Sequence, residues 1–399
     1  MRQVIMLWSE ANPSTIEKNH LMSSGLVQNG MDVSVIMLCH KEEEHNLYTS
    51  IVGTRPPYHF DMGPVGALFR GNNRLTKLIN NCKLAGLLFL KLFKTLYRHS
   101  DSTLIIPRET LEIAIPAIIL SKIFRCRLIA NIMEYAPSLP LYHKHIRNRI
   151  RWNLILTYSD AYIVISKFLM EIFQDRGKPI FYLPAIIDGT SLNEIKKLND
   201  SSYAVELATI IEKDIPILLY TCDSVYGEIL EFCLQALAMI KESKFVFYIT
   251  GRYTDSEQNE WLEMIERLGL SNRIVFTGFI DQEDLLNLQI KSTALLIPLP
   301  NTIRHKARFP QKILKYICLK KPIISTNIGE IASLFEDNQT AFIDKSISID
   351  GYAQKIKYTL SNPDMVHQVC ENAYELVLTR FNHLLWGMRL KEFITRVRK

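Results

Sequence analysis

The segment Arg308–Tyr316 reads RFPQKILKY, and it is the most informative stretch of the sequence for the fold. Pro310 suits the first position of a helix, because the N–H that proline lacks would be unpaired there. A helix is therefore predicted to begin at this proline. Arg308, Lys312 and Lys315 are spaced at i, i+4 and i+7, so we expect all three on one side of that helix.

Positive charge is concentrated around this segment. Between Leu285 and Gly329 there is no Asp or Glu, while eight Lys or Arg occur there. Cations at a helix N-terminus face the positive end of the helix dipole, so an anion bound there would offset a destabilising arrangement. The functional interpretation is a diphosphate site formed by Arg304, Arg308, Lys312 and the helix start. The charge alone leaves a solvated basic face equally open.

Short apolar runs alternate with amphipathic stretches of helix length along the chain. Continuous apolar strands separated by helices predict parallel sheets covered on both faces, and two sets of six strands predict two doubly wound α/β domains. The expected strands are 4–7, 33–38, 103–106, 127–131, 161–165 and 180–183 in the first half, and 217–220, 246–250, 273–277, 294–297, 323–325 and 341–343 in the second.

A chain of 399 residues suits two domains. We expect an N-terminal domain at 1–187, a linker region without a convincing strand at 188–214, and a C-terminal domain at 215–380. Residues 381–399 are expected to form a C-terminal helix that packs back on the N-terminal domain. Ligands of open parallel sheets bind beyond the carboxyl ends of the strands, so the cleft between the domains is the expected site.

Composition indicates a folded protein, with 48% hydrophobic and 22% charged residues. The seven cysteines are odd in number and form no CxxC pair, which favours a reducing compartment over a disulfide framework or a zinc site. The start, MRQVIMLWSE, is predicted to be a strand rather than a signal peptide, and no uninterrupted apolar run reaches about 18 residues. We therefore expect a cytoplasmic protein, peripheral at the inner face of the membrane.

Several stretches resemble the family 4 glycosyltransferases. Residues 309–330, FPQKILKYICLKKPIISTNIGE, resemble the family's donor-site segment, especially the bacterial surface-polysaccharide branch with a Phe-Pro-x-Lys-x-x-Glu-Tyr pattern. Residues 261–300 are similar to the family's succession of helix, LGL, strand, F-x-G and acidic-start helix. Residues 104–138 and 160–169 also look like their counterparts. The resemblance covers nearly the whole chain and is strongest from 261 to 343.

The resemblance implies a GT-B fold, in which two Rossmann-like domains face a central cleft. It also implies a nucleotide-sugar donor, no metal or other cofactor, and transfer of a hexosyl group with retained configuration. The acceptor would be a glycan or a lipid-linked molecule in cell-surface polysaccharide biosynthesis. By the same resemblance, the donor base contacts the backbone at one turn and the diphosphate contacts the helix start. The implied donor-binding residues are Gly251, Gly278, Phe279, Ile280, Phe309, Pro310, Gln311 and Lys312.

The sequence departs from the family at two acidic positions. Lys315 occupies the position at which the family has a Glu that binds the donor ribose. Ala307 aligns with another Glu of the family, which lies near the donor sugar. An Arg and Lys pair after the first donor-domain strand and an N-terminal Gly-Gly loop are also missing. We therefore count Lys315 among the donor-binding candidates while expecting altered ribose recognition. An inactive scaffold or activator subunit of a partner transferase stays open, as does a sugar-nucleotide epimerase.

Acceptor chemistry is predicted at two strand ends of the first half. Arg108 and Glu109 follow the strand 103–106, and Glu134 follows the strand 127–131. Either carboxylate could orient or deprotonate an acceptor hydroxyl, and these three are the catalytic candidates. A surface Arg–Glu pair or a helix cap explains them equally well. A retaining enzyme of this kind needs no paired carboxylates.

Two basic, apolar segments favour contact with an anionic membrane. Residues 62–100 contain seven Lys or Arg and no acid, and residues 135–159 contain Lys144, Arg147, Arg149 and Arg151. Basic amphipathic helices of this type bind anionic membrane surfaces. The alternative is a core helix with lysines that reach out to water. No nucleic-acid-binding motif accompanies these charges, so nucleic acid is not an expected partner.

Overall fold

The structure is a computed structural model that describes residues 3–8, 13–37, 48–49, 51–52, 56–62, 74–99, 101–107, 111–188, 215–221 and 227–397. The chain divides into two compact units. The N-terminal unit contains the described residues up to Asp188, the segment Ala307–Phe309 and the C-terminal stretch from Phe381. The C-terminal unit contains the described residues of Gly189–Lys306 and Pro310–Arg380. Apart from Asp188, the predicted linker lies outside the described residues.

The N-terminal unit contains a seven-stranded parallel sheet with the order β3-β2-β1-β4-β5-β6-β7. The chain begins in β1, winds to one edge, and returns to continue from β4, which is doubly wound topology. The strands are β1 Gln3–Trp8, β2 Asp32–Met37, β3 His59–Met62, β4 Thr103–Pro107, β5 Arg127–Ile132, β6 Ala161–Val164 and β7 Ile180–Tyr182.

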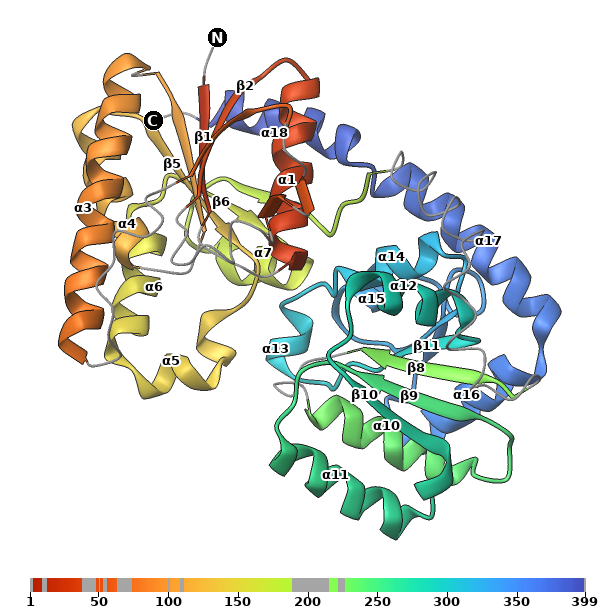
Figure 1. Ribbon diagram of the computed structural model, residues 1–399. Coiled ribbons are helices and arrows are strands. Elements are labelled where there is room, and N and C mark those ends of the chain that lie inside the picture. Colours follow the sequence, from red (N-terminus) through yellow and green to blue (C-terminus); the bar gives the residue numbers. More distant parts are fainter. Residues whose placement is uncertain are drawn as a thin grey trace. The chain divides into compact units, whose positions relative to one another are not determined.

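Helices cover both faces of this sheet, with α1 and α18 on one face and α3, α4 and α6 on the other (Figure 1). Such double cover explains why β1 is buried along its whole length and reads as a continuous apolar run. The helices of this unit are α1 Pro13–Gln28, α3 Arg74–Arg98, α4 Leu111–Ile123, α5 Pro140–Lys144, α6 Ile146–Tyr158, α7 Lys167–Gln174 and α18 His383–Arg396, with a 3-10 turn at Ala136–Ser138.

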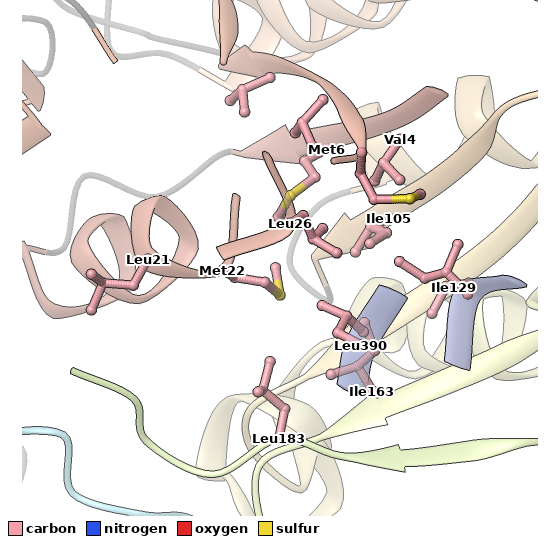
Figure 2. Packing of buried hydrophobic residues seen from close by; sticks show 14 of the residues in the cluster. Val4, Met6, Leu21, Met22, Leu26, Ile105, Ile129, Ile163, Leu183 and Leu390 are labelled. Carbon is pink, nitrogen blue, oxygen red and sulfur yellow. The ribbon is translucent and has the colours of Figure 1, made fainter. Parts of the chain in front are cut away.

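A hydrophobic core fills the space between the sheet and the pair α1 and α18. Alternate residues of β1, such as Val4 and Met6, point into it and meet Leu26 of α1 (Figure 2). Leu390 of α18 joins the same cluster. The C-terminal helix therefore contributes to the core of the N-terminal unit although it lies at the opposite end of the sequence from β1.

The backbones of α1 and α18 touch at two glycines. A Cβ built on Gly25 would lie 2.5 Å from the carbonyl oxygen of His383, and one built on Gly387 would lie 2.3 Å from the carbonyl carbon of Gly25. Lys391 Nζ donates a hydrogen bond of 2.7 Å to the carbonyl of Asn29 and ties the helix ends together. Glycine is needed at both positions, because no other residue permits so close a helix contact.

The C-terminal unit contains a six-stranded parallel sheet with the order β10-β9-β8-β11-β12-β13. Its topology repeats that of the first six strands of the N-terminal unit. The strands are β8 Ile217–Thr221, β9 Val246–Thr250, β10 Ile274–Gly278, β11 Ala294–Ile297, β12 Ile323–Thr326 and β13 Phe342–Asp344.

In this unit α10 and α11 lie on one face of the sheet and α14 and α15 on the other (Figure 1). Local sequence sets the limits of α11: Thr254 and Glu257 form a capping box, and Gly269 ends the helix in the left-handed conformation. The helices are α10 Gly227–Met239, α11 Asp255–Leu268, α12 Gln282–Lys291, α13 Ile303–Lys306, α14 Lys312–Cys318, α15 Gly329–Leu334, α16 Ile349–Ser361 and α17 Pro363–Arg380, with a 3-10 turn at Ser271–Arg273.

All twelve predicted strands are present, and their ends differ by no more than about a residue. Strand β3 was missed. It has four residues, two of which are His59 and Asp61, and it pairs only with β2 at the sheet edge. A short edge strand with polar side chains lacks the apolar run by which buried strands are detected.

Lys18 of α1 is a buried amine in the N-terminal unit. Its Nζ donates a hydrogen bond of 3.4 Å to the carbonyl of Leu183. Burial lowers the pKa of Lys18 from 10.5 to about 7, because desolvation disfavours the charged form. Between those pH values the unfolded chain binds more protons than the folded one. The free energy of unfolding therefore rises with pH from about 7 to 10.5, and the cost of this buried charge is greatest below pH 7.

We expect the substitution Lys18→Met to raise the free energy of unfolding most below pH 7, since a tenfold change in proton affinity corresponds to about 1.4 kcal/mol. At pH 10 the gain should be much smaller. Urea titrations at pH 6 and pH 10 measure the difference, with Lys94→Met at an exposed position of α3 as the control. A gain for Lys18→Met that is the same at both pH values would contradict this account of the buried amine.

Candidate functional site

The strand order of the C-terminal unit reverses at β8, which has β9 on one side and β11 on the other. In doubly wound sheets the crevice for ligands lies outside the carboxyl ends of the strands at this reversal. Residues that follow β8 and β11 are therefore the first candidates for a binding site in this unit.

Side chains from these two places meet. Arg304 and His305 belong to α13, which follows β11, and Glu228 lies in the first turn of α10, which follows β8. The Glu228 carboxylate oxygen Oε1 is 3.8 Å from Arg304 Nη1 and 3.7 Å from His305 Nε2. The other ring nitrogen of His305, Nδ1, lies 2.8 Å from the Thr302 hydroxyl. A carboxylate and a guanidinium thus meet at the strand-order reversal.

Lys312 reaches the end of β8 from α14. Its ammonium donates a hydrogen bond to the carbonyl of Thr221, the last residue of β8, and lies 5.4 Å from the centre of the Tyr220 ring. Lys312 is half-buried. The predicted cation is therefore positioned by the strand at which the sheet order reverses.

The predicted helix start is wrong by two residues, because α14 begins at Lys312 and not at Pro310. The residues before it form a tighter turn, in which Ile313 N–H donates to the Pro310 carbonyl and Leu314 N–H donates to the Gln311 carbonyl. Arg308 consequently precedes the helix. The expectation that it shares one helix side with Lys312 and Lys315 is also wrong.

Gly251 and Gly278, both predicted donor-binding residues, lie side by side at the ends of β9 and β10. The Gly251 N–H donates to the Gly278 carbonyl at 3.0 Å, and the Gly278 N–H donates to the Tyr253 hydroxyl at 2.6 Å. Both glycines have positive φ, at 154° and 69°, which other residues rarely adopt. The next residue, Phe279, is exposed, and the Arg252 guanidinium lies 4.4 Å from its ring centre.

The remaining predicted residues of the segment have different surroundings. Phe309 belongs to the three-residue segment that groups with the N-terminal unit, where its ring is buried 5.9 Å from that of Phe381. Gln311 has a buried amide nitrogen, Nε2, with no hydrogen-bond partner among the described residues. The half-buried residues are Ile280, Arg308, Pro310, Gln311 and Lys315.

Of the catalytic candidates, Arg108 and Glu109 lie outside the described residues. Glu134 follows β5 directly before the 3-10 turn and is half-buried. Among the parts of the chain that the structure describes, no group of three or more His, Cys, Asp and Glu side chains is arranged to hold a metal ion.

Sequence reasoning missed four residues of this site: Glu228, Arg252, Tyr253 and His305. Each has a weak signal in the sequence, because each comes shortly after a predicted strand end. The sequence does not predict that Glu228 meets Arg304 and His305, or that the Arg252 guanidinium stacks on Phe279, because these contacts join residues that are far apart in the chain.

Residues 211–376 match the family model described as Glycosyl transferases group 1. The match to a group 1 glycosyltransferase domain thus lies in the C-terminal half of the chain. Every residue of the site from Glu228 to Lys315 lies inside this glycosyltransferase domain. No curated protein matches the sequence.

Solved structures similar to this glycosyltransferase extend the likeness over the whole chain. Sucrose-phosphate synthase from Thermosynechococcus elongatus has a TM-score of 0.74 at 15% identity, covering 100% of this chain and 99% of that one. Anabaena Alr3699/HepE, in complex with UDP and glucose, has a TM-score of 0.70 at 17% identity, covering 99% and 100%. A glycosyltransferase from Rickettsia africae ESF-5 has a TM-score of 0.70 at 16% identity, covering 99% and 98%.

These likenesses confirm the predicted GT-B architecture of two Rossmann-like domains. The prediction of a glycosyltransferase is likewise confirmed. Among the described helices, none combines the length and the apolar character that a bilayer crossing requires.

Proposed function

We propose that this glycosyltransferase transfers a hexosyl group from a nucleotide-sugar donor to a glycan or lipid-linked acceptor in cell-surface polysaccharide biosynthesis. The observation that carries the proposal is the placement of Arg304 and Lys312 at the strand-order reversal of the glycosyltransferase domain. A nucleoside diphosphate needs cations at such a point. The similar Anabaena protein was solved with UDP and with UDP-glucose.

The proposed donor site has two parts. Arg304, Arg308 and Lys312 bind the diphosphate, and the turn formed by Gly251 and Gly278 receives the base against its backbone. The close hydrogen bond between these two glycines and the absence of a Cβ at either support a near approach of the base. Phe279, Ile280, Phe309, Pro310, Gln311 and Lys315 complete the proposed donor-binding set.

We propose that transfer needs no metal and retains the anomeric configuration. The bond between the anomeric carbon and the diphosphate oxygen breaks with its electron pair on the diphosphate, the acceptor oxygen bonds to that carbon, and the acceptor hydroxyl proton passes to the departing diphosphate. Preorganised cations can stabilise the departing diphosphate without a metal. Turnover that persists at full rate in excess EDTA, with an α-configured product from an α-configured donor, supports both statements. Loss of turnover in EDTA contradicts the first, and inversion the second.

Saturation-transfer NMR with UDP-glucose, UDP-galactose, UDP-N-acetylglucosamine and GDP-mannose tests the donor proposal directly. We expect at least one of these to bind, with contacts to both base and sugar. If none binds at millimolar concentration, the proposed function is wrong.

On the acceptor side we propose Arg108, Glu109 and Glu134. The half-buried position of Glu134 at the carboxyl end of β5 supports its inclusion, because ligands of a parallel sheet bind at that edge. Its role would be to orient or deprotonate an acceptor hydroxyl.

An inactive scaffold remains the second candidate for one structural reason. Ala307 is buried, and its carbonyl accepts a hydrogen bond of 3.0 Å from the Ser166 hydroxyl, while Lys315 is a cation. Neither position can supply the carboxylate that the resemblance led us to expect. Turnover by the purified protein alone excludes the scaffold, and donor binding without turnover, when no partner transferase is present, favours it.

Helix α3 supports the proposed contact with an anionic membrane, because it carries apolar residues on two sides. One stripe repeats every four residues and is buried, and the other consists of exposed residues on the opposite side, near both ends of the helix. The buried stripe consists of Leu84, Leu88, Leu92 and Leu96. The exposed stripe contains Leu75, Ile79, Leu90, Phe93 and Tyr97, of which Leu90 and Tyr97 are 67% and 76% exposed.

Helix α4 packs along α3 and extends the exposed stripe. Ile115, Ile119 and Ile123 face solvent at i, i+4 and i+8, and Phe93 of α3 lies 5.2 Å from Phe124 between ring centres. We call the exposed stripe and these three isoleucines the outer face. Exposed apolar patches of this extent mark binding surfaces.

The charges on α3 select the partner of the outer face. The helix contains no acidic residue, and Lys94 and Arg98 are exposed beside the apolar stripe. An anionic lipid surface matches both features, since it accepts apolar side chains and attracts lysine and arginine at about 1 kcal/mol each. We therefore propose that the outer face lies on the membrane that carries a lipid-linked acceptor.

Replacing Leu90 and Phe93 together by glutamine is expected to lower binding to vesicles at least fivefold, because it removes two large apolar side chains from the membrane contact. Cosedimentation with phosphatidylcholine vesicles containing about 30% phosphatidylglycerol, an anionic lipid, measures the bound fraction. Met388→Gln, at an exposed position of α18, is the control. Equal binding of wild type and double variant, or equal binding to pure phosphatidylcholine, contradicts the proposal.

A further inference from the structure

Glu228 is an acidic residue in a strongly basic environment. The stretch between Leu285 and Gly329, which supplies Arg304, His305 and Lys312, contains no acid. Glu228 reaches these residues from another segment, the first turn of α10. It therefore acts on the charge of the proposed diphosphate site from outside the segment that forms it.

The two oxygens of this carboxylate have different surroundings. Oε1 faces a guanidinium and an imidazole, at 3.8 Å from Arg304 and 3.7 Å from His305. Oε2 accepts no hydrogen bond within the described part of the chain, and the side chain is 44% exposed. One oxygen thus lies within ion-pair distance of a guanidinium, and the exposed carboxylate can accept a hydrogen bond from a ligand.

His305 lies beside the carboxylate on its inner side, with Nε2 at 3.7 Å from Oε1. The imidazole is buried at 1% exposure and contacts the Thr302 hydroxyl through Nδ1 at 2.8 Å. The carbonyl of His305 also lies 3.0 Å from where a Cβ of Gly329 would stand, so the α13 backbone is closely packed. A carboxylate held against such a rigid partner is preorganised to accept a hydrogen bond.

We propose that Glu228 binds a hydroxyl group of the donor through Oε2 and thereby favours a nucleotide that carries a sugar over the bare nucleoside diphosphate. This inference rests on the proposed function, because it requires the diphosphate at Arg304 and Lys312. Glu228 shares Arg304 with that diphosphate, so hydroxyls that flank the diphosphate come within its reach. Carboxylates are strong acceptors for hydroxyl groups.

The same carboxylate repels the diphosphate, and this gives the proposal a distinctive signature. Glu228 repels the bare nucleoside diphosphate, which has few hydroxyls to donate to Oε2. A nucleotide sugar carries additional hydroxyls, and their hydrogen bonds to Oε2 would offset the repulsion. Charge removal alone, as in Glu228→Gln, also favours the bare diphosphate, which carries more negative charge than its sugar ester, so the charge-conserving Glu228→Asp separates the two effects. The ratio of the two affinities is therefore the quantity to measure.

Isothermal titration calorimetry of wild type and Glu228→Gln with UDP and UDP-glucose, and with GDP and GDP-mannose, tests the inference. For the pair that binds, we expect the variant to bind the bare diphosphate about three- to tenfold more tightly, since a nearby negative charge is removed. We expect the preference for the nucleotide sugar over the bare diphosphate to fall about tenfold, as for a lost hydrogen bond to a charged group. Glu228→Asp, which keeps the charge but shortens the reach, should leave the affinity for the bare diphosphate near that of wild type and lower only the affinity for the nucleotide sugar.

Glu231→Gln is the matched control, because it removes the same charge from an exposed position one turn along α10. It should leave both affinities unchanged. If wild type binds a pair but Glu228→Asp keeps its affinity ratio, this inference fails and the proposed function stands. If wild type binds neither pair nor any other nucleotide sugar of the donor panel, the proposed function itself fails.

Discussion

Replacing Lys312 by methionine is expected to weaken nucleotide-sugar binding about tenfold or more and to lower turnover by about a hundredfold or more. The ammonium of Lys312 lies at the end of β8, where it donates to the Thr221 carbonyl. Stabilisation of charge on the departing diphosphate needs a cation that is already in place, so its loss should affect turnover more than binding. Calorimetry and initial rates with the donor identified by NMR measure the two effects.

Methionine keeps most of the side-chain stem over the Tyr220 ring, so the variant separates the charge from the packing. Lys312→Ala should have the same effect on turnover with a greater loss of stability. Lys320→Ala is the control, because it removes an exposed cation near the end of the same helix that pairs with Glu371 at 2.6 Å. Unchanged affinity and rate in both Lys312 variants would place the diphosphate elsewhere.

Replacing Gly25 by alanine is expected to destabilise the N-terminal unit by about 3 kcal/mol or more, which is at the upper end for overpacking. The added Cβ would lie 2.5 Å from the His383 carbonyl oxygen, a backbone atom that cannot rotate away. Helices α1 and α18 would have to separate, and the shared core around Leu26 and Leu390 would open. Urea unfolding followed by tryptophan fluorescence measures the loss, since Trp386 belongs to this core.

Gly86→Ala provides the matched control. Gly86 is also a helical glycine of the N-terminal unit, but a Cβ built on it meets nothing within 4 Å. Alanine there should stabilise the unit by about 0.5 to 1 kcal/mol through helix propensity. Gly387→Ala should behave like Gly25→Ala, because it closes the same contact from the other helix. If all three variants had similar stability, the close approach of α1 and α18 would be excluded.

Much of the fold was predictable because buried parallel strands are apolar on both faces. Runs such as Ile217–Thr221 are detectable by composition alone, and so is their alternation with amphipathic helices. Strand β3 was not detectable, since His59 and Asp61 interrupt it and pairing with β2 defines it. The start of α14 was misjudged because proline preference describes an average helix, and here tighter turn bonds precede Lys312.

The candidate site was predictable in part. The positive charge around Lys312 and the glycines at the ends of β9 and β10 stood out in the sequence. The hydrogen bond from Gly251 to Gly278 did not, because it joins residues 27 positions apart. Glu228 was not predicted as a site residue, because nothing in the sequence distinguishes it from other acidic residues. In the fold it meets Arg304 and His305.

The segment around Lys312 shows what each level of description determined. By itself the sequence determined that the chain forms two doubly wound domains and that a basic segment follows one of the strands of the second domain. Both features could be predicted because periodicity and charge are local properties of the chain. Tertiary structure alone decided that Lys312 meets the end of β8 and that Glu228 meets Arg304 across the strand-order reversal. The physical reason is that strand order, rather than distance along the chain, determines which loops converge at the carboxyl edge of a parallel sheet.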